Sequence, residues 1–281
     1  MTAPVQTAPI EVWLDAEAIR QRILQAQCVF LFMDFDGTLA PIVSVPSLAA
    51  LPQDLKTALR TLIGRRDVVP AIISGREVID LQNRVALPLI YAGNHGLEIR
   101  GAGLEHTVHE AQQMRVQLLA ACNVLRARLE PYAGTLVECK RLTASVHVRQ
   151  ADRAVVPAVM EIVQSVIGSY RNFRVSGGKE VFEIRPKVVW NKGSAVRWIL
   201  EQMEGREVDA ICIGDDATDE DMFAELKDGI TVRVGSESAT AAQYCIRENE
   251  VLRFLHFVGD TVEQRRCARQ SAYESSNCGT R

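Results

Sequence analysis

The chain has 281 residues, of which 47% are hydrophobic and 24% charged, and its formal net charge at pH 7 is -3. This length allows two compact domains, or one α/β domain with a sizeable insertion. The slightly negative charge argues against a nucleic-acid partner, and the apolar run at residues 28–33 is far shorter than the roughly 20 residues of a membrane span. Residues 1–15 lack the pattern of a secretory signal, and the seven cysteines are typical of reduced thiols, so we expect a cytoplasmic protein.

Apolar runs followed by polar, glycine-containing turns predict buried strands of a parallel sheet. These runs cover residues 28–33, 68–73, 89–92 and 210–213. Amphipathic helices are expected at 51–64 and 193–203, so strands and helices alternate as in a doubly wound sheet. Ligands bind at the carboxyl ends of the strands in such sheets, which places the turns at Asp34, Ser74 and Asp215 at one edge.

Residues 106–186 have a different pattern, which predicts an inserted α+β unit. Helices are expected at 110–129 and 155–170, and strands at 136–141, 144–150, 173–176 and 180–185. Apolar residues alternate along the strands, so one face of this second sheet can pack under the helices. The opposite face carries Glu138, Lys140, His147, Arg149, Glu183 and Arg185. From the pattern alone we expect a solvated face with cross-strand ion pairs.

The predicted organisation is therefore a discontinuous α/β core with an insertion. Residues 1–105 and 187–258 form the core, and residues 106–186 form the inserted domain. Residues 259–281 are polar and lack an apolar period over their final stretch, so we expect a disordered tail.

Two groups of acids suggest a metal site. Asp34 and Asp36 lie two residues apart at the end of a buried strand, where both carboxylates can face one cleft, and burying them together is unfavourable unless a cation neutralises them. With Asp215, they can hold a hard octahedral ion such as Mg²⁺. Lys192 and Ser74 each lie near a predicted helix start and can bind a phosphate group. The alternative interpretation of Lys192 is an ordinary surface lysine.

The order of these motifs, Asp34-x-Asp36-x-Thr38, then Ser74, Lys192 and the pair Asp215-Asp216, resembles the haloacid dehalogenase (HAD) superfamily. Further stretches narrow the resemblance to trehalose-6-phosphate phosphatases, and together the motifs reach from Phe30 to Phe223. These stretches lie at residues 93–98, 138–149, 178–186, 191–193 and 214–221. The implied fold is a Rossmann-like HAD core with an inserted α+β cap domain for sugar recognition.

The resemblance implies Mg²⁺-dependent hydrolysis of trehalose 6-phosphate through an aspartyl phosphate. It implies Asp34 as the nucleophile, Asp36 as the general acid and base, and Ser74 and Lys192 as contacts of the phosphate. The implied substrate contacts are Asp34, Asp36, Gly37, Ser74, Gly75, Arg76, Glu138, Lys140, Arg149, Lys179 and Glu183, with Arg185 as a neighbour. The implied metal ligands are Asp34, Asp215, Asp36 through its backbone carbonyl, and Asp219 directly or through water.

The resemblance also replaces the solvated face by a cap that closes its polar sheet face over the phosphate site. His95 is interpreted as a structural loop residue near the cleft, and His147 as part of the cap surface. Two alternatives stay open: a phosphatase for sucrose phosphate or a glycosyl phosphoglycerate, and a non-catalytic sugar-phosphate-binding regulatory domain. We expect a monomer by default, with functional coupling to a trehalose-phosphate synthase.

Overall fold

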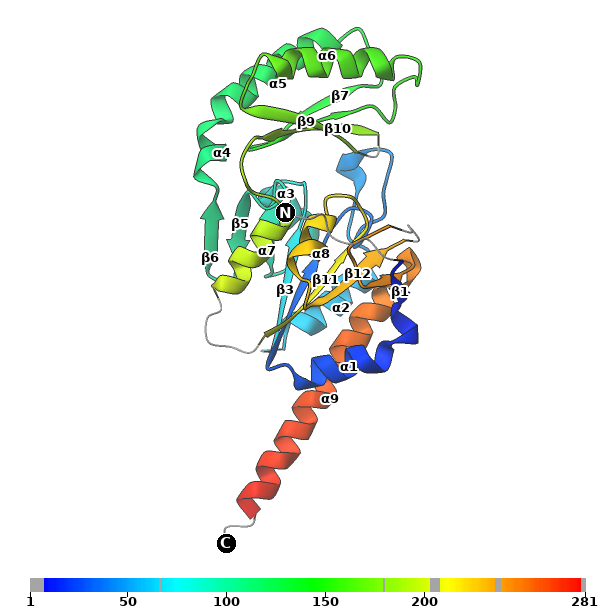
Figure 1. The fold of residues 1–281 in the computed structure, drawn as a ribbon, viewed down its shortest axis with the longest axis vertical. Helices are drawn as coiled ribbons and strands as arrows, with labels where there is room; N and C mark the ends of the chain where they lie inside the picture. Colours follow the sequence, from blue (N-terminus) through cyan, green and yellow to red (C-terminus); the bar gives the residue numbers. More distant parts are fainter. Residues whose placement is uncertain (1–7, 66, 179, 203–207, 236–238, 279–281) are drawn as a thin grey trace.

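The computed structural model describes residues 8–65, 67–178, 180–202, 208–235 and 239–278. Within these ranges the chain forms a large sheet flanked by helices and a smaller sheet, which lies above the large one in Figure 1. None of the described helices is both long and apolar enough to cross a membrane.

The large sheet confirms the expected doubly wound core. In sheet order its described strands are β1 (Ile10–Glu11), β13 (Tyr244–Ile246), β12 (Ile230–Val234), β11 (Val208–Gly214), β2 (Cys28–Met33), β3 (Val68–Ile73), β4 (Ile90–Gly93), β5 (Glu98–Gly101) and β6 (Leu104–Thr107). Neighbours from β1 to β4 are parallel, whereas β5 and β6 add an antiparallel hairpin at the edge. The predicted strands are present, and the hairpin extends the large sheet to Thr107.

Helices cover both faces of the large sheet, which explains why all six residues of β2 are buried. One face packs against α1 (Ala16–Gln25), α2 (Gln53–Ile63), α3 (Val78–Val85) and α9 (Val251–Cys278), the other against α7 (Lys192–Glu201) and α8 (Glu220–Glu225). Short 3₁₀ helices lie at Val12–Leu14, Pro46–Leu48 and Glu248–Glu250. Leu31 and Met33 face the first layer, and Phe30 and Phe32 face the second. The N-terminal segment docks on the core through the buried Ile19 of α1.

The inserted unit is a four-stranded antiparallel sheet under two helices. Its elements are α4 (His109–Gln113), α5 (Arg115–Leu129), β7 (Leu136–Cys139), β8 (Ala144–His147), α6 (Val156–Gly168), β9 (Phe173–Gly178) and β10 (Val181–Pro186), with strand order β7-β8-β10-β9. Apolar side chains of the sheet, such as Val146 and Ile184, pack in one cluster with residues of α5 and α6. Figure 1 shows these two helices on the side of the small sheet that is away from the core. The polar sheet face therefore points toward the large sheet.

The two segments that connect the insertion with the core pack against each other. The segment that enters it contains His106 of β6, and the segment that returns from it contains Trp190. The His106 ring stacks on Trp190 with ring centroids 5.1 Å apart, and on Trp198 of α7 at 4.7 Å. The indole nitrogen of Trp190 also donates to the Gly96 carbonyl at 2.8 Å.

The expected disordered tail is wrong for the part that follows residue 258, because α9 continues to Cys278. Phe254, Val258 and Val262 are spaced by four residues and are all buried against the core. Arg265, only 2% exposed, donates through Nη1 to the carbonyls of Ile23 and Ala26 at 3.0 and 2.7 Å. The polar composition of this segment led to the wrong prediction, because a charged side chain such as Arg265 is buried here and binds backbone carbonyls at the end of α1.

Candidate active site

Three side chains that follow neighbouring strands meet at the carboxyl edge of the large sheet, as the sequence predicted. Asp34 follows β2, Ser74 follows β3 and Asp215 follows β11, and these strands are adjacent in the sheet. All three residues are buried. The doubly wound topology thus gathers residues that lie far apart in the sequence.

Carboxylates from two of these strand ends form a compact cluster. One oxygen each of Asp34, Asp215 and Asp219 lies within 4.8 Å of the others. The cluster requires close backbone approach, because a side-chain carbon at Gly37 would lie 2.4 Å from Asp215 Oδ2 and one at Gly214 would lie 2.3 Å from Asp219 Cγ. Asp219 Oδ2 accepts the backbone N–H of Asp215 at 2.9 Å, which fixes the loop after β11.

Lys192 joins this cluster from the first turn of α7. Its Nζ donates to Asp34 Oδ1 at 2.6 Å and to Asp219 Oδ1 at 2.7 Å, and the residue is 2% exposed. The side chain of Asn191 accepts the backbone N–H of Ser194 at 2.8 Å and so caps the helix that carries Lys192. Lys192 is therefore no ordinary surface lysine.

The pKa values of the clustered groups indicate whether a metal cation would fit between them. Burial raises the pKa of Asp34 well above its ordinary value and that of Asp219 to about 6, although Lys192 opposes both shifts. Burial acts against the charge of Lys192 too, but Asp219 and Asp34 outweigh it and raise the pKa of the lysine. Lys192 binds two of the three clustered carboxylates, those of Asp34 and Asp219. An all-oxygen donor set of this kind suits a hard divalent cation, which would lower the carboxylate pKa values.

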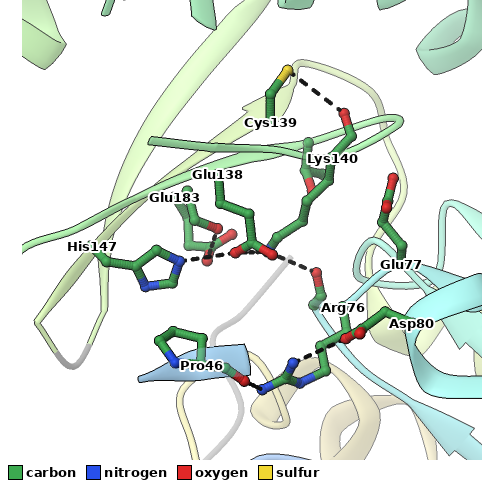
Figure 2. Close-up of polar contacts among 12 residues, drawn as sticks. Pro46, Arg76, Glu77, Asp80, Glu138, Cys139, Lys140, His147 and Glu183 are labelled. Atoms are coloured by element: carbon green, nitrogen blue, oxygen red, sulfur yellow. Dashed lines mark hydrogen bonds and ion pairs between the residues drawn. The ribbon is translucent and has the colours of Figure 1, made fainter. Parts of the chain in front are cut away.

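The carboxylate of Asp36 lies on Arg76 and not in the acidic cluster, where the two-acid pattern alone would place it, whereas its backbone carbonyl stays the proposed ligand. Arg76 donates from Nε to Asp36 Oδ2 at 2.6 Å and from Nη2 to Oδ1 at 2.7 Å. Arg76 also binds Asp80 at 2.9 Å and the Pro46 carbonyl at 2.9 Å (Figure 2). A bidentate guanidinium offers two charge-assisted bonds, whereas the acidic cluster would repel another carboxylate.

The loop after β3, residues 74–76, lies between the core and the insertion. Ser74 Oγ accepts the backbone N–H of Arg76 at 3.2 Å. The Gly75 carbonyl accepts from Lys140 Nζ of the insertion at 3.1 Å, and a side-chain carbon at Gly75 would lie 2.8 Å from the His95 ring. Glycine is therefore required where the two domains meet over this loop.

The polar face of the insertion lines a cavity together with the core. The cavity has a volume of about 410 Å³. Its lining from the insertion includes Glu138, Lys140, His147, Arg149, Glu183 and Arg185, and from the core it includes Asp34, Asp36, Ser74, Gly75, Arg76, Lys192 and Asp215. The solvated outer face expected from the pattern alone is therefore wrong (Figure 2). Lys179 lies outside the described residues.

The acids of this face are held by hydrogen bonds. Glu138 Oε2 pairs with His147 Nε2 at 2.9 Å, within the insertion. Glu183 Oε1 accepts from Ser145 Oγ at 2.9 Å, and Glu183 Oε2 pairs with His95 Nε2 of the core at 3.1 Å. Burial opposes the ionisation of Glu183, but Lys140 and His95 outweigh it and lower its pKa, so the group is a carboxylate at neutral pH.

Sequence reasoning missed several cavity residues. Arg233, in the apolar strand β12, pairs with Glu220 at 2.8 Å, and an arginine inside an apolar run is a usable signal of a buried, paired charge. Ile42, Val43 and Pro46 bring an apolar loop to the cavity, and no local pattern in the sequence marks this loop.

The sequence is similar to proteins of one family. A sequence profile of the trehalose-phosphatase family matches residues 32–249. The chain is 35% identical to probable trehalose-phosphate phosphatase 3 of Oryza sativa subsp. japonica, over 90% of this chain and 77% of that protein. It is also 35% identical to the trehalose-phosphate phosphatase of Mycobacterium marinum, over 83% of this chain but only 61% of that longer protein.

Solved structures agree on the fold. The C-terminal domain of Candida albicans trehalose-6-phosphate phosphatase superposes with a TM-score of 0.77 at 24% sequence identity. The match covers 91% of this chain and 99% of that domain, so core and insertion have the same overall arrangement in both.

Proposed function

Since this chain belongs to the trehalose-phosphatase family, we propose that it hydrolyses trehalose 6-phosphate to trehalose and inorganic phosphate. One observation carries the proposal: a single cavity joins a buried acid–lysine cluster to a polar sheet face rich in hydrogen-bonding groups. The cluster suits a phosphate ester with a cation, and the sheet face suits a sugar with many hydroxyls. A volume of about 410 Å³ is in the range that holds small-molecule ligands.

In the proposed reaction Asp34 attacks the phosphorus atom, and the bond from phosphorus to the sugar oxygen breaks to give an aspartyl phosphate. Asp36 protonates the leaving sugar oxygen and then removes a proton from the water that hydrolyses the intermediate. Arg76 holds the Asp36 carboxylate by two hydrogen bonds, which fix the orientation of the group that transfers the proton. Lys192 opposes the effect of burial and lowers the pKa of Asp34, which favours the ionised nucleophile, and it offers positive charge to the transferred phosphoryl group.

We assign Asp34, Asp215 and Asp219 to Mg²⁺ binding, with Asp36 contributing through its backbone carbonyl. When bound, the cation would neutralise charge between the phosphate and the nucleophile. Ser74, Gly75 and the backbone at Gly37 are proposed to contact the phosphate. Burial of the cluster excludes bulk water from Asp34.

Sugar recognition is assigned to the insertion, which we propose acts as a cap. Glu138 and Glu183 accept hydrogen bonds from sugar hydroxyls, and Lys140 and Arg149 donate them. Buried polar groups reject a ligand that leaves them unpaired, so this face selects for a matching pattern of hydroxyls. The proposal extends to Lys179 as a contact, and to a monomeric, cytoplasmic enzyme that works with a trehalose-phosphate synthase.

The test is phosphate release with Mg²⁺ from trehalose 6-phosphate, glucose 6-phosphate, sucrose 6-phosphate and para-nitrophenyl phosphate. We expect a strong preference for trehalose 6-phosphate, loss of release in Asp34→Asn, and unchanged release in the matched control Asp260→Asn, which alters an exposed residue of α9. Preference for another ester would refute the substrate and retain the reaction. No release from any ester would favour the regulatory binding domain, against which the intact Asp34, Asp36, Lys192 and Asp215 argue.

A further inference from the structure

The turn between β4 and β5, residues 93–96, contacts both the loop after β3 and the cap. On the core side, the backbone N–H of His95 donates to the Ser74 carbonyl at 2.8 Å, and that of Asn94 donates to the Arg76 carbonyl at 2.6 Å. The His95 ring also lies over Gly75. The turn therefore supports the segment that we assign to phosphate binding.

The backbone of this turn is unusual. The backbone φ angle is 52° at Asn94 and 58° at His95, in a region that residues other than glycine adopt uncommonly. Both residues are buried, Asn94 completely. Conformations of this kind persist only where surrounding contacts determine them, and they cluster at functional sites.

On the cap side, the same two residues form two of the hydrogen bonds that cross the domain boundary. Thr143 Oγ1 donates to Asn94 Oδ1 at 2.9 Å, and His95 Nε2 pairs with Glu183 Oε2 at 3.1 Å. The other oxygen of Glu183 is bound by Ser145, which belongs to the cap. One oxygen of Glu183 is thus held in every cap position, whereas the other is held only while the cap is closed on the core.

The direction of the His95 bond follows from the charge states. Burial is the largest influence on His95 and lowers its pKa to about 4, so the ring is neutral at pH 7. Glu183 is a carboxylate, which can only accept, and the proton is therefore assigned to Nε2. Nδ1 is buried and has no hydrogen-bond partner among the residues that the structure describes. Nδ1 is the nitrogen that could accept a proton, and because it is buried and the pKa of the ring is about 4, His95 is poorly suited to act as a base.

We propose that His95 is a positioning residue for sugar recognition, which orients the carboxylate of Glu183 only when the cap closes over the loop after β3. The inference rests on the proposed role of Glu183 as a sugar contact. It links closure to selectivity, because an open cap leaves Glu183 with one of its two hydrogen bonds. Esters without a sugar would gain less from this alignment.

A double-mutant cycle tests the proposal with His95→Ala, Glu183→Gln and the double variant, measured as kcat/KM with Mg²⁺ on trehalose 6-phosphate and on para-nitrophenyl phosphate. A displaced contact group costs about tenfold to hundredfold, which is the loss we expect for His95→Ala on trehalose 6-phosphate. The loss on the aryl ester should be at least tenfold smaller. The double variant should match Glu183→Gln, because His95 acts only through Glu183.

Two further variants separate positioning from general support of the fold. His95→Gln, whose amide nitrogen can reach Glu183, should recover most of the lost kcat/KM. Thr143→Val removes the neighbouring core–cap hydrogen bond without touching Glu183, so its effect should multiply with that of Glu183→Gln.

Losses that multiply for His95→Ala and Glu183→Gln, or equal losses on both esters, would overturn this inference and leave the proposed function standing. A wild-type enzyme that cleaves the aryl ester but not trehalose 6-phosphate would overturn the proposed substrate, and the inference with it. The two failures can be told apart, because the first appears in the kcat/KM values of the variants and the second in the substrate preference of the wild type.

Discussion

Replacing Lys192 with methionine should destabilise the protein strongly, by an amount that depends on Mg²⁺. The Lys192 side chain is 3% exposed and binds Asp34 at 2.6 Å and Asp219 at 2.7 Å. Methionine fills similar space but leaves two buried carboxylates without their cation, and breaking a buried ion pair in this way costs about 3–5 kcal/mol. We therefore expect the free energy of unfolding to fall by about 4 kcal/mol in EDTA. Mg²⁺ should recover part of this loss by binding the acids that remain.

Urea unfolding of wild type and Lys192→Met, each in EDTA and in Mg²⁺, measures this effect. The double variant Lys192→Met, Asp34→Asn should be more stable than Lys192→Met alone in EDTA, because it buries one charge fewer. A loss below about 1 kcal/mol, or an Asp34→Asn change that destabilises the lysine variant further, would refute the view that Lys192 balances buried charge.

Further predictions concern pH, proton transfer and the C-terminal helix. Unfolded histidine takes up its proton near its ordinary pKa of 6.5, whereas folded His95 does so at about 4, so stability is complete above pH 6.5 and falls as the pH decreases toward 4. Thermal melts of wild type should lose about 3 kcal/mol more over this range than those of His95→Gln. Arg76→Lys cannot hold Asp36 by two bonds and should lower kcat about tenfold on every ester tested, which initial-rate assays would show. Arg265→Met should reduce the free energy of unfolding by about 2–4 kcal/mol in urea, because Asp67 and two carbonyls lose their donor, while KM stays unchanged.

The sequence predicted best what depends on local pattern and general topology. The strand at 28–33 is apolar throughout because both faces of the sheet are covered, and a run of that kind is unambiguous. The meeting of Asp34, Ser74 and Asp215 follows from the carboxyl ends of adjacent parallel strands. Strands β5 and β6 were missed because both have only four residues, most of them polar or glycine, and they form a hairpin of which β6 is the edge strand.

Contacts that depend on how two domains sit together had no local signal. His95 and Glu183 are 88 residues apart, and their pairing requires the cap to rest on the core. The partner of Asp36 was equally hidden, because a pattern of two acids cannot show that a guanidinium 40 residues away offers the better match. Alternation did predict which face of the cap sheet is polar, but not that this face is enclosed.

The aromatic stack between the two segments that connect the cap with the core gives the molecule a built-in optical reporter. The chain has three tryptophans, and Trp190 and Trp198 are the two that stack on His106 where the segments entering and leaving the cap meet. Trp13 packs on the other face of the large sheet against α9, with its ring centroid 6.0 Å from that of Phe257, and can serve as an internal reference. The chain enters and leaves the cap at this stack, so we expect cap movement to change the surroundings of the two stacked indoles, and intrinsic fluorescence of the unlabelled protein measures this as ligand is added.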